Sequence, residues 1–310
     1  MRLIYEQGAE GRRGVTIPKS DVPAQEVLPN KYLRDKEPML PEVSELEVVR
    51  HFTNLSRLNF SVDSNGYPLG SCTMKYNPKF TEQIASMEGF IDLHPLLPAL
   101  KGGEALTQGS LEVVYQLERS LAQITGMAAF TTQPLAGAHG ELTGVMLISA
   151  FHRQNGAQRK YIIVPDSSHG TNPASAAIAG YQVVVIPTDK DGYMDLDAYK
   201  KNLNDDVAAV MLTCPDTLGI FNPRIKEITE CAHAVGALMY YDGANLNGII
   251  GKARPGDLGF DVVHLNLHKT FATPHGGGGP GAGPVGVSEK LSAFLPVPRL
   301  NKDKNGLITL

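Results

Sequence analysis

Six short apolar runs, separated by polar loops and stretches of helical periodicity, constrain the fold more than any other feature of this sequence. A strand buried on both faces is a continuous apolar run, whereas a helix repeats its apolar residues every three or four positions. Strands that alternate with helices form a mostly parallel sheet with helices on both faces. We therefore predict an α/β fold, with strands over residues 128–132, 161–164, 182–186, 207–213, 237–241 and 261–265.

Helical patterns occupy several intervals between these runs. Apolar residues recur at spacings of three and four over residues 111–124, which predicts an amphipathic helix that ends at Gly126. A second helical pattern runs to about Asn155, and a third begins near Thr171. After the last apolar run, residues 283–287 are predicted to form an edge segment of the sheet.

The beginning of the chain has a different character. Residues 1–45 contain five prolines among many charges and show little periodicity, which indicates an extended arm that lies on another surface. A short helical stretch over residues 44–59 follows, and then a loop over residues 63–78 whose length is typical of functional loops. We therefore predict an arm with a short helix over residues 1–62 and one large domain over residues 63–310.

An acid and a lysine follow two neighbouring apolar runs. Asp242 ends the run that begins near Ala237, and Lys269 comes soon after the run that ends at Leu265. Ligands of open α/β sheets bind at the carboxyl ends of the strands. A lysine that forms a Schiff base and a carboxylate that keeps a ring nitrogen protonated are the pair that binds pyridoxal phosphate. The alternative is that Asp242 opens a turn with Gly243 and Lys269 is a solvated loop lysine.

A turn of small residues precedes the helical pattern that runs to Asn155. Such a turn lets backbone N–H groups at a helix N-terminus approach an anion, and the helix dipole favours the negative charge. We predict that Gly137, Ala138 and His139 bind the cofactor phosphate. An ordinary turn between strand and helix is the alternative.

Two further loops leave predicted strands at the same edge of the sheet. His169 is predicted to stack on the pyridine ring and to transfer a proton; alternatively, it caps the following helix. Thr217 is predicted to hydrogen-bond the ring oxygen of the cofactor, although a proline-rich turn explains the same residues.

Composition excludes several classes of function. The net charge is -4, the isoelectric point is about 6.1, and no long basic block is present, so we expect neither a nucleic acid nor an anionic membrane as partner. No apolar segment is long enough for a signal peptide or a bilayer span, which predicts a cytoplasmic protein. The three cysteines lack metal-ligand spacing and are expected to be reduced thiols, with no metal site.

Five motifs together resemble one family, the P-protein of the glycine cleavage system, and specifically its second subunit. The resemblance covers nearly the whole chain and rests on residues 71–78, 133–141, 166–173, 241–245 and 267–271. It implies a fold-type I enzyme that contains pyridoxal phosphate and decarboxylates glycine, passing the aminomethyl group to the lipoyl arm of a carrier, the H-protein. It also implies a first subunit of similar fold without the lysine, in a heterotetramer of two copies of each subunit.

The resemblance assigns roles to individual residues. Lys269 is expected to carry the cofactor beside His268, with His169 stacked on its ring and Asp242 at the ring nitrogen. The residues expected near the substrate are Ser71, Cys72, Asn77 and His94. Members of this family continue into a small carboxyl-terminal domain, so we expect that domain to be missing from this chain.

Two other functions stay open. One is another fold-type I activity, such as an aminotransferase or a cysteine desulfurase, although all three cysteines lie outside the late loop that a desulfurase requires. The other is a structural subunit without catalytic activity, against which Lys269 argues.

Overall fold

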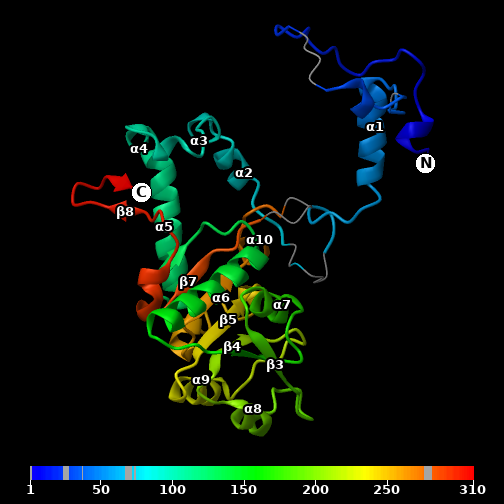
Figure 1. Cartoon of the computed structure of the whole chain (residues 1–310). Coiled ribbons are helices and arrows are strands. Elements are labelled where there is room, and N and C mark those ends of the chain that lie inside the picture. The colour runs from blue at the N-terminus through cyan, green and yellow to red at the C-terminus, as the bar shows by residue number, and fades with distance from the viewer. Residues whose placement is uncertain (1, 24–27, 37, 67–71, 73–74, 276–280) are drawn as a thin grey trace. The chain divides into compact units, whose positions relative to one another are not determined.

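The computed structural model describes residues 2–23, 28–36, 38–66, 72, 75–275 and 281–310. The chain forms two compact units, Met1–Tyr67 and Pro68–Leu310 (Figure 1). None of the described helices combines the length and the apolar composition that a bilayer span requires.

The first unit is built around one helix. It contains η1 (Ile4–Glu6), η2 (Asn30–Tyr32) and α1 (Glu45–Ser56). A capping box starts α1, because the Ser44 side chain accepts from the backbone of Glu47 while the Glu47 carboxylate accepts from the backbone of Ser44. The start of the arm returns to this helix, where Gln7 Nε2 lies 3.1 Å from Nδ1 of His51.

The second unit contains a seven-stranded sheet in the order β1-β7-β6-β5-β4-β2-β3. Its strands are β1 (Ala129–Thr131), β2 (Tyr161–Pro165), β3 (Gln182–Ile186), β4 (Val207–Thr213), β5 (Leu238–Gly243), β6 (Val262–Leu265) and β7 (Val285–Val287). Neighbouring strands from β3 to β6 are parallel, and β7 is antiparallel to both β6 and β1. All six predicted strands are therefore confirmed within two residues at each end.

One strand does not lie where the sequence predicted it. Residues 283–287 were expected at the edge of the sheet, yet β7 pairs with β6 on one side and with β1 on the other. That prediction is wrong because a short Val-Gly-Val run is compatible with several pairings. The edge strands of the sheet are β1 and β3.

Helices connect the strands and surround the sheet. They are α2 (Phe80–Ala85), α3 (Glu88–Ile91), α4 (Gly103–Leu106), α5 (Gln108–Thr125), α6 (Gly137–Gln154), α7 (Thr171–Ile178), α8 (Leu196–Asn202), α9 (Ile225–Ala234) and α10 (Leu267–Thr270). The 3-10 helices are η3 (Leu97–Ala99), η4 (Leu246–Gly248), η5 (Pro255–Leu258) and η6 (Glu289–Phe294), and a hairpin of β8 (Asn301–Lys302) and β9 (Ile308–Thr309) follows. The helices predicted to end at Gly126 and Asn155 are confirmed, with these residues at their C-caps.

Two apolar cores lie on the two faces of the sheet. One core includes side chains of α5, α8 and α9, and the other includes side chains of α6, α7 and η6. Consecutive side chains of β5 point into opposite cores. Tyr240 packs in the core that includes α6, and Tyr241 packs in the core that includes α5. The sheet is therefore the middle of three layers, as the alternation of strands and helices predicted.

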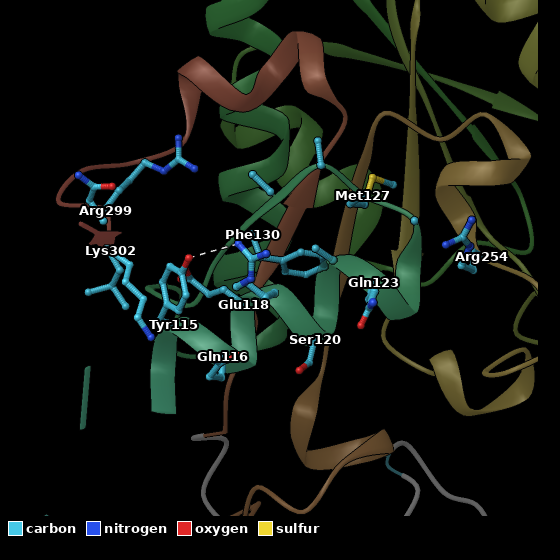
Figure 2. A pocket seen from close by; sticks show the side chains of 17 residues that line it. Tyr115, Gln116, Glu118, Ser120, Gln123, Met127, Phe130, Arg254, Arg299 and Lys302 are labelled. Carbon is cyan, nitrogen blue, oxygen red and sulfur yellow. Dashed lines mark hydrogen bonds between the residues drawn. The ribbon is translucent and has the colours of Figure 1, made fainter. Parts of the chain in front are cut away.

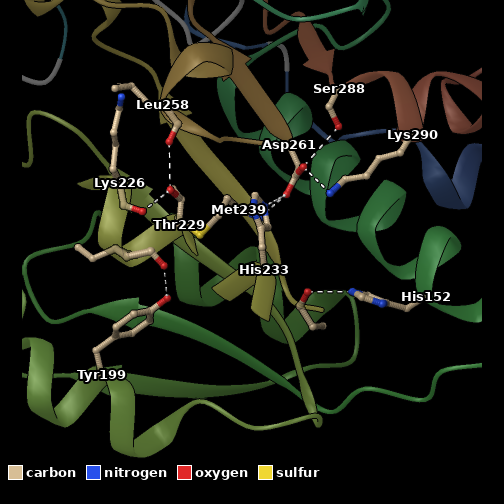
Figure 3. A network of polar contacts seen from close by, with 12 residues as sticks. His152, Tyr199, Lys226, Thr229, His233, Met239, Leu258, Asp261, Ser288 and Lys290 are labelled. Carbon is tan, nitrogen blue, oxygen red and sulfur yellow. Dashed lines mark hydrogen bonds and ion pairs between the residues drawn. The ribbon is translucent and has the colours of Figure 1, made fainter. Parts of the chain in front are cut away.

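A buried carboxylate joins several elements at the amino end of β6. Asp261 is 4% exposed, and its side chain accepts from the backbone N–H of Met239, from His233 and from Lys290 (Figure 3). These contacts link the start of β6 to β5, α9 and η6. They lie at the end of β6 opposite Lys269 and so stabilise the sheet away from the candidate site.

Candidate active site

The carboxyl ends of β2, β4, β5 and β6 meet at one edge of the sheet, because these strands are parallel neighbours. This is the edge at which open α/β sheets bind ligands. Asp242 lies near the end of β5, and Lys269 lies in α10, which follows β6. Asp242 is buried and Lys269 is partly buried. The two residues that suggested a cofactor site are thus brought to the same edge.

Asp242 is held by polar contacts from α7, from β6 and from the turn that follows β5. Its Oδ2 accepts from Asn172 Nδ2 of α7 at 2.9 Å, and its Oδ1 accepts from the backbone N–H of Ala244 at 3.0 Å. His264 Nε2 of β6 lies 3.3 Å from the same Oδ1. Burial alone raises the pKa of the Asp242 carboxyl, but His264, these hydrogen bonds and the charge of Lys269 lower it below its ordinary value. Asp242 is therefore a buried carboxylate that stays ionised.

Strand register places Thr213, Asp242 and His264 side by side across β4, β5 and β6. In-register residues of neighbouring strands point to the same face of a sheet. The same face carries Tyr240, two residues before Asp242, and lies under α6 and α7. A polar row therefore crosses the sheet below the amino ends of these two helices.

The amino end of α6 has no side-chain cap and lies close to residues of the sheet. The N-cap residue is Ala136, which supplies no side-chain acceptor, so among the described residues the first N–H groups, at Gly137, Ala138 and His139, stay available to an anion. A Cβ at Gly140 would lie 2.3 Å from the carbonyl oxygen of Gly283, so glycine is required for this contact. The predicted phosphate site thus has the backbone geometry that anion binding needs.

The segment around Lys269 is packed by residues from a distant part of the sequence. Lys75 Nζ donates to the carbonyl oxygen of His268 at 3.0 Å, and Asn77 Nδ2 donates to the carbonyl oxygen of Ala272 at 3.2 Å. Burial lowers the pKa of His268, with further lowering by the positive charges around it. Asn77, a predicted site residue, therefore lies against the segment that carries Lys269, and His268 is the residue before that lysine in α10.

Cys72 belongs to the same neighbourhood. Its Sγ lies 3.4 Å from Nε2 of His275. Ser71, the residue before it, lies outside the described residues. The cysteines form no disulfide.

His169 is exposed and lies after β2. Its Nδ1 accepts from the backbone N–H of Thr171 at 3.2 Å and lies 2.7 Å from the hydroxyl of the same residue, which is the capping contact that the alternative interpretation predicted. Thr171 in turn donates to Glu141 Oε2 at 2.8 Å. His169 is thereby connected to the polar row, and its role at a cofactor ring stays a prediction.

For two predicted site residues, Thr217 and His94, the described contacts stay within the loop that carries each residue. Thr217 is exposed in the turn that Asp216 closes by accepting from the backbone of Leu218 and Ile220. His94 is exposed, and its Nδ1 accepts from the backbone N–H of Leu96 at 3.1 Å. These contacts neither place the two side chains at the cofactor edge nor give them another function.

Sequence reasoning missed five residues around Asp242: Glu141, Asn172, Thr213, Tyr240 and His264. Glu141 and Asn172 lie within longer motifs in which sequence reasoning assigned neither of them a role of its own. Tyr240 and His264 sit inside apolar runs, and a histidine within such a run was the one available signal of a buried polar contact.

Several buried polar atoms at this edge have no hydrogen-bond partner among the described residues. Within the described part of the chain, five buried side-chain atoms lack a hydrogen-bond partner, and four of them belong to residues of this edge: Glu141, Asn172, Thr213 and Asn266. Buried polar atoms are rarely unpaired in a native protein, so such a cluster indicates a polar ligand. Together with the lysine, the carboxylate and the amino end of α6, these atoms fit pyridoxal phosphate.

A separate groove of about 720 Å³ runs along α5, the edge strand β1 and residues 299–302 (Figure 2). Its basic side chains already have partners, because Lys302 contacts Glu112 at 2.7 Å and Arg254 contacts Asp257 at 2.7 Å. Its lining includes none of the predicted site residues. The sheet edge with Lys269 is therefore the candidate active site.

Comparison with known proteins agrees with this geometry. The family described as Aminotransferase class-V matches residues 142–279. A probable glycine dehydrogenase (decarboxylating) subunit 2 of Caldanaerobacter subterraneus subsp. tengcongensis is 57% identical over 308 residues, which are 98% of this chain and 62% of that protein. The protein of the same name from Chloroherpeton thalassium is 57% identical over 98% of this chain and 61% of its own length. The chain thus spans less than two thirds of these curated relatives.

Solved structures show the same fold. A crystal structure of glycine decarboxylase (P-protein) of the glycine cleavage system, in inhibitor-bound form, has a TM-score of 0.72 and 21% identity, and the match covers 91% of this chain and 62% of that one. A sphingosine-1-phosphate lyase of Burkholderia pseudomallei has a TM-score of 0.61 and 15% identity, with 85% of this chain covered. The fold is that of the fold-type I pyridoxal-phosphate-dependent transferases.

Within this class, the sequence similarity is more specific. Over almost its whole length, the chain is similar to proteins named probable glycine dehydrogenase (decarboxylating) subunit 2.

Proposed function

We propose that this chain is the lysine-bearing part of a glycine dehydrogenase (decarboxylating) that depends on pyridoxal phosphate. Its substrate is glycine, and the aminomethyl group that remains after loss of carbon dioxide passes to the lipoyl arm of a carrier, the H-protein. The observation that carries this proposal is the placement of Lys269 and Asp242 at one sheet edge, in a chain 57% identical to relatives of that name. We also propose a first subunit as partner, in a heterotetramer of two copies of each.

Pyridoxal phosphate supplies an electron sink for the negative charge that decarboxylation leaves on the substrate carbon. Lys269 holds the cofactor through its amine. Asp242 would keep the ring nitrogen protonated, because His264, the hydrogen bonds from Asn172 and Ala244 and the charge of Lys269 keep this buried carboxyl ionised. The amino end of α6, with Gly137, Ala138 and His139, binds the phosphate. Asn77 and Lys75 position the segment around Lys269, in which we propose that His268 contacts the cofactor.

The lipoyl arm must reach the same sheet edge. Its disulfide accepts the aminomethyl carbon on one sulfur, and the other sulfur becomes a thiol, so the disulfide is reduced while the glycine α-carbon is oxidised. His169 is exposed beside this edge, and we propose it as the group that stacks on the cofactor ring. We propose that Ser71, Cys72 and His94 contact the substrate. Thr217 is proposed to contact the cofactor.

The test is exchange of the glycine carboxyl group with labelled bicarbonate, measured on the full-length protein with the first subunit and the lipoylated carrier. We expect exchange that requires all three proteins and that disappears when Lys269 is changed to alanine. Bound cofactor without exchange, together with amino-group transfer or sulfur release from cysteine, would instead identify an aminotransferase or a desulfurase. Absence of cofactor would indicate a structural subunit.

A further inference from the structure

His264 is a buried histidine to which the proposed chemistry gives no role. It is 2% exposed, and both ring nitrogens face polar partners on β5. Its Nε2 lies 3.3 Å from Asp242 Oδ1, and its Nδ1 lies 2.8 Å from the hydroxyl of Tyr240. Both partners come from one strand, since Tyr240 and Asp242 are two residues apart and point to the same face of the sheet. The imidazole is therefore held at both ends.

Tyr240 makes this arrangement rigid. Its side chain is fully buried, and its hydroxyl oxygen also lies 3.4 Å from the carbonyl oxygen of Glu141. Burial raises the pKa of the Tyr240 phenol far above its ordinary value, so the phenol stays neutral. The single phenol proton is donated either to Nδ1 or to the Glu141 carbonyl oxygen, and in the second case the hydroxyl accepts from Nδ1; each arrangement fixes the plane of the imidazole ring. Helix α6 closes over this contact, because a Cβ at Gly144 would lie 2.4 Å from the Tyr240 ring.

Several titratable groups surround His264. Glu141 of α6 is a second buried acidic residue, and one oxygen of Glu141, one of Asp242 and a ring nitrogen of His264 lie within 4.8 Å of one another. The imidazole of His264 therefore lies beside both carboxyl groups. The titratable groups that face this cluster are Glu141 from α6, Tyr240 and Asp242 from β5, and Lys269 from α10. His264 contacts two of these groups, Tyr240 and Asp242.

We propose that His264, oriented by Tyr240, is a positioning residue that keeps the Asp242 carboxylate ionised and fixed toward the ligand edge of the sheet. The use of that carboxylate by a cofactor rests on the proposed function, whereas the contact itself does not. With His264 in place, Asp242 Oδ1 has two described donors and Oδ2 has one, Asn172. Oδ2 therefore retains a lone pair for a further donor.

The experiment follows the ionisation of Asp242 in the ligand-free protein. Aspartate labelled with ¹³C at its side-chain carboxyl is incorporated, and the Asp242 resonance is assigned by its loss in Asp242→Asn. We expect a titration midpoint below the ordinary value of about 3.9. His264→Phe should raise this midpoint by about one pH unit or more, a tenfold change in the ionisation constant.

Further variants separate orientation from charge. His264→Gln retains an N–H donor and should restore part of the shift, and Tyr240→Phe should loosen the imidazole and give a smaller shift in the same direction. His152→Phe is the matched control, because His152 is also a buried histidine of this domain but contacts the carbonyl oxygen of Ala208 at 2.8 Å. It should leave the Asp242 midpoint unchanged. Circular dichroism establishes that each variant is folded.

A second readout is the affinity for pyridoxal phosphate, measured from its visible absorbance at neutral pH. We expect at least a tenfold loss in His264→Phe and no loss in His152→Phe. Unchanged Asp242 midpoints in folded His264→Phe and His264→Gln would overturn the positioning role, even if the cofactor binds normally. Wild-type protein that shows the low midpoint but binds no cofactor would overturn the proposed function and leave the role of His264 standing.

Discussion

The ammonium nitrogen of Lys290 lies 2.7 Å from Oδ1 of Asp261, which ties η6 to the first residue before β6 (Figure 3). Oδ2 of the same carboxylate accepts from the backbone of Met239 at 2.8 Å and lies 2.8 Å from His233 Nε2. Burial alone raises the pKa of Asp261, but His233, Lys290 and the backbone donor lower it below its ordinary value. Asp261 is therefore a buried anion surrounded by donors.

Asp261→Asn should destabilise the large domain by about 2–4 kcal/mol, because an amide NH₂ meets groups that are themselves donors. Urea unfolding at pH 7, followed by circular dichroism, measures the loss. Asp206→Asn is the matched control, since Asp206 forms a surface pair with Lys160 at 3.1 Å and should cost less than about 1 kcal/mol. Equal stability of the two variants would contradict a structural role for the Asp261 network.

The same carboxylate predicts a pH dependence. Since the folded pKa of Asp261 is lowered, its contribution to stability is complete above the unfolded value of about 3.9 and is lost as the pH falls through the folded value. The difference in unfolding free energy between wild type and Asp261→Asn should be constant from pH 7 to about pH 5 and should shrink below that. If this difference in unfolding free energy instead grows as the pH falls, the pKa of Asp261 is raised rather than lowered in the folded protein.

Lys269→Ala should abolish the covalent adduct that borohydride reduction forms with bound pyridoxal phosphate. The amine of this partly buried lysine is the attachment point that the proposed function requires. Mass spectrometry of the reduced protein measures the adduct. Lys252→Ala changes an exposed lysine outside the candidate site and should leave the adduct intact.

Asp242→Asn should preserve the fold and slow glycine carboxyl exchange by ~10²-fold or more, because a neutral amide does not hold a proton on the ring nitrogen. The measurement is the exchange rate of the full-length protein with its partner subunit and carrier, at saturating cofactor. A rate within a factor of a few of the wild-type rate would exclude Asp242 from that role.

Gly140→Ala should destabilise the domain by about 1–3 kcal/mol and weaken cofactor binding, because the added Cβ lies 2.3 Å from the carbonyl oxygen of Gly283. Relief of this contact moves the amino end of α6. Gly109→Ala in α5 is the control, since no atom lies within 4 Å of its added Cβ. That change should stabilise the protein by up to about 1 kcal/mol, because alanine is the better helix former. Thermal unfolding compares the two.

The positions of the parallel strands could be predicted because each apolar run is long and bounded by turn residues. The run over residues 207–213, for example, coincides with β4. The pairing of β7 could not be predicted, since three residues carry no information about which strands they join. Helix ends were predictable where glycine takes a left-handed conformation, as Gly126 does with a φ of 73° after α5.

The sequence predicts the site residues whose charged side chains come soon after a predicted strand. Asp242 and Lys269 both do, and both reach the same edge. The contact between Asp242 and His264 depends on the register of β5 against β6, which the sequence of either strand alone does not specify. His94 and Thr217 lie on exposed loops whose positions depend on tertiary contacts rather than on local pattern.

The position of β7 has a consequence for the order in which the domain can assemble during synthesis. Phe130 of β1 pairs with Gly286 of β7, and β1 has no other described strand partner. Strand β1 must therefore wait, as the ribosome adds the intervening strands and helices, until β7 emerges. Helix α6 follows β1 directly, so its amino end reaches its final place against Gly283 only at that late moment. The nascent protein should consequently gain its ability to bind ligand only when most of the domain has left the exit tunnel.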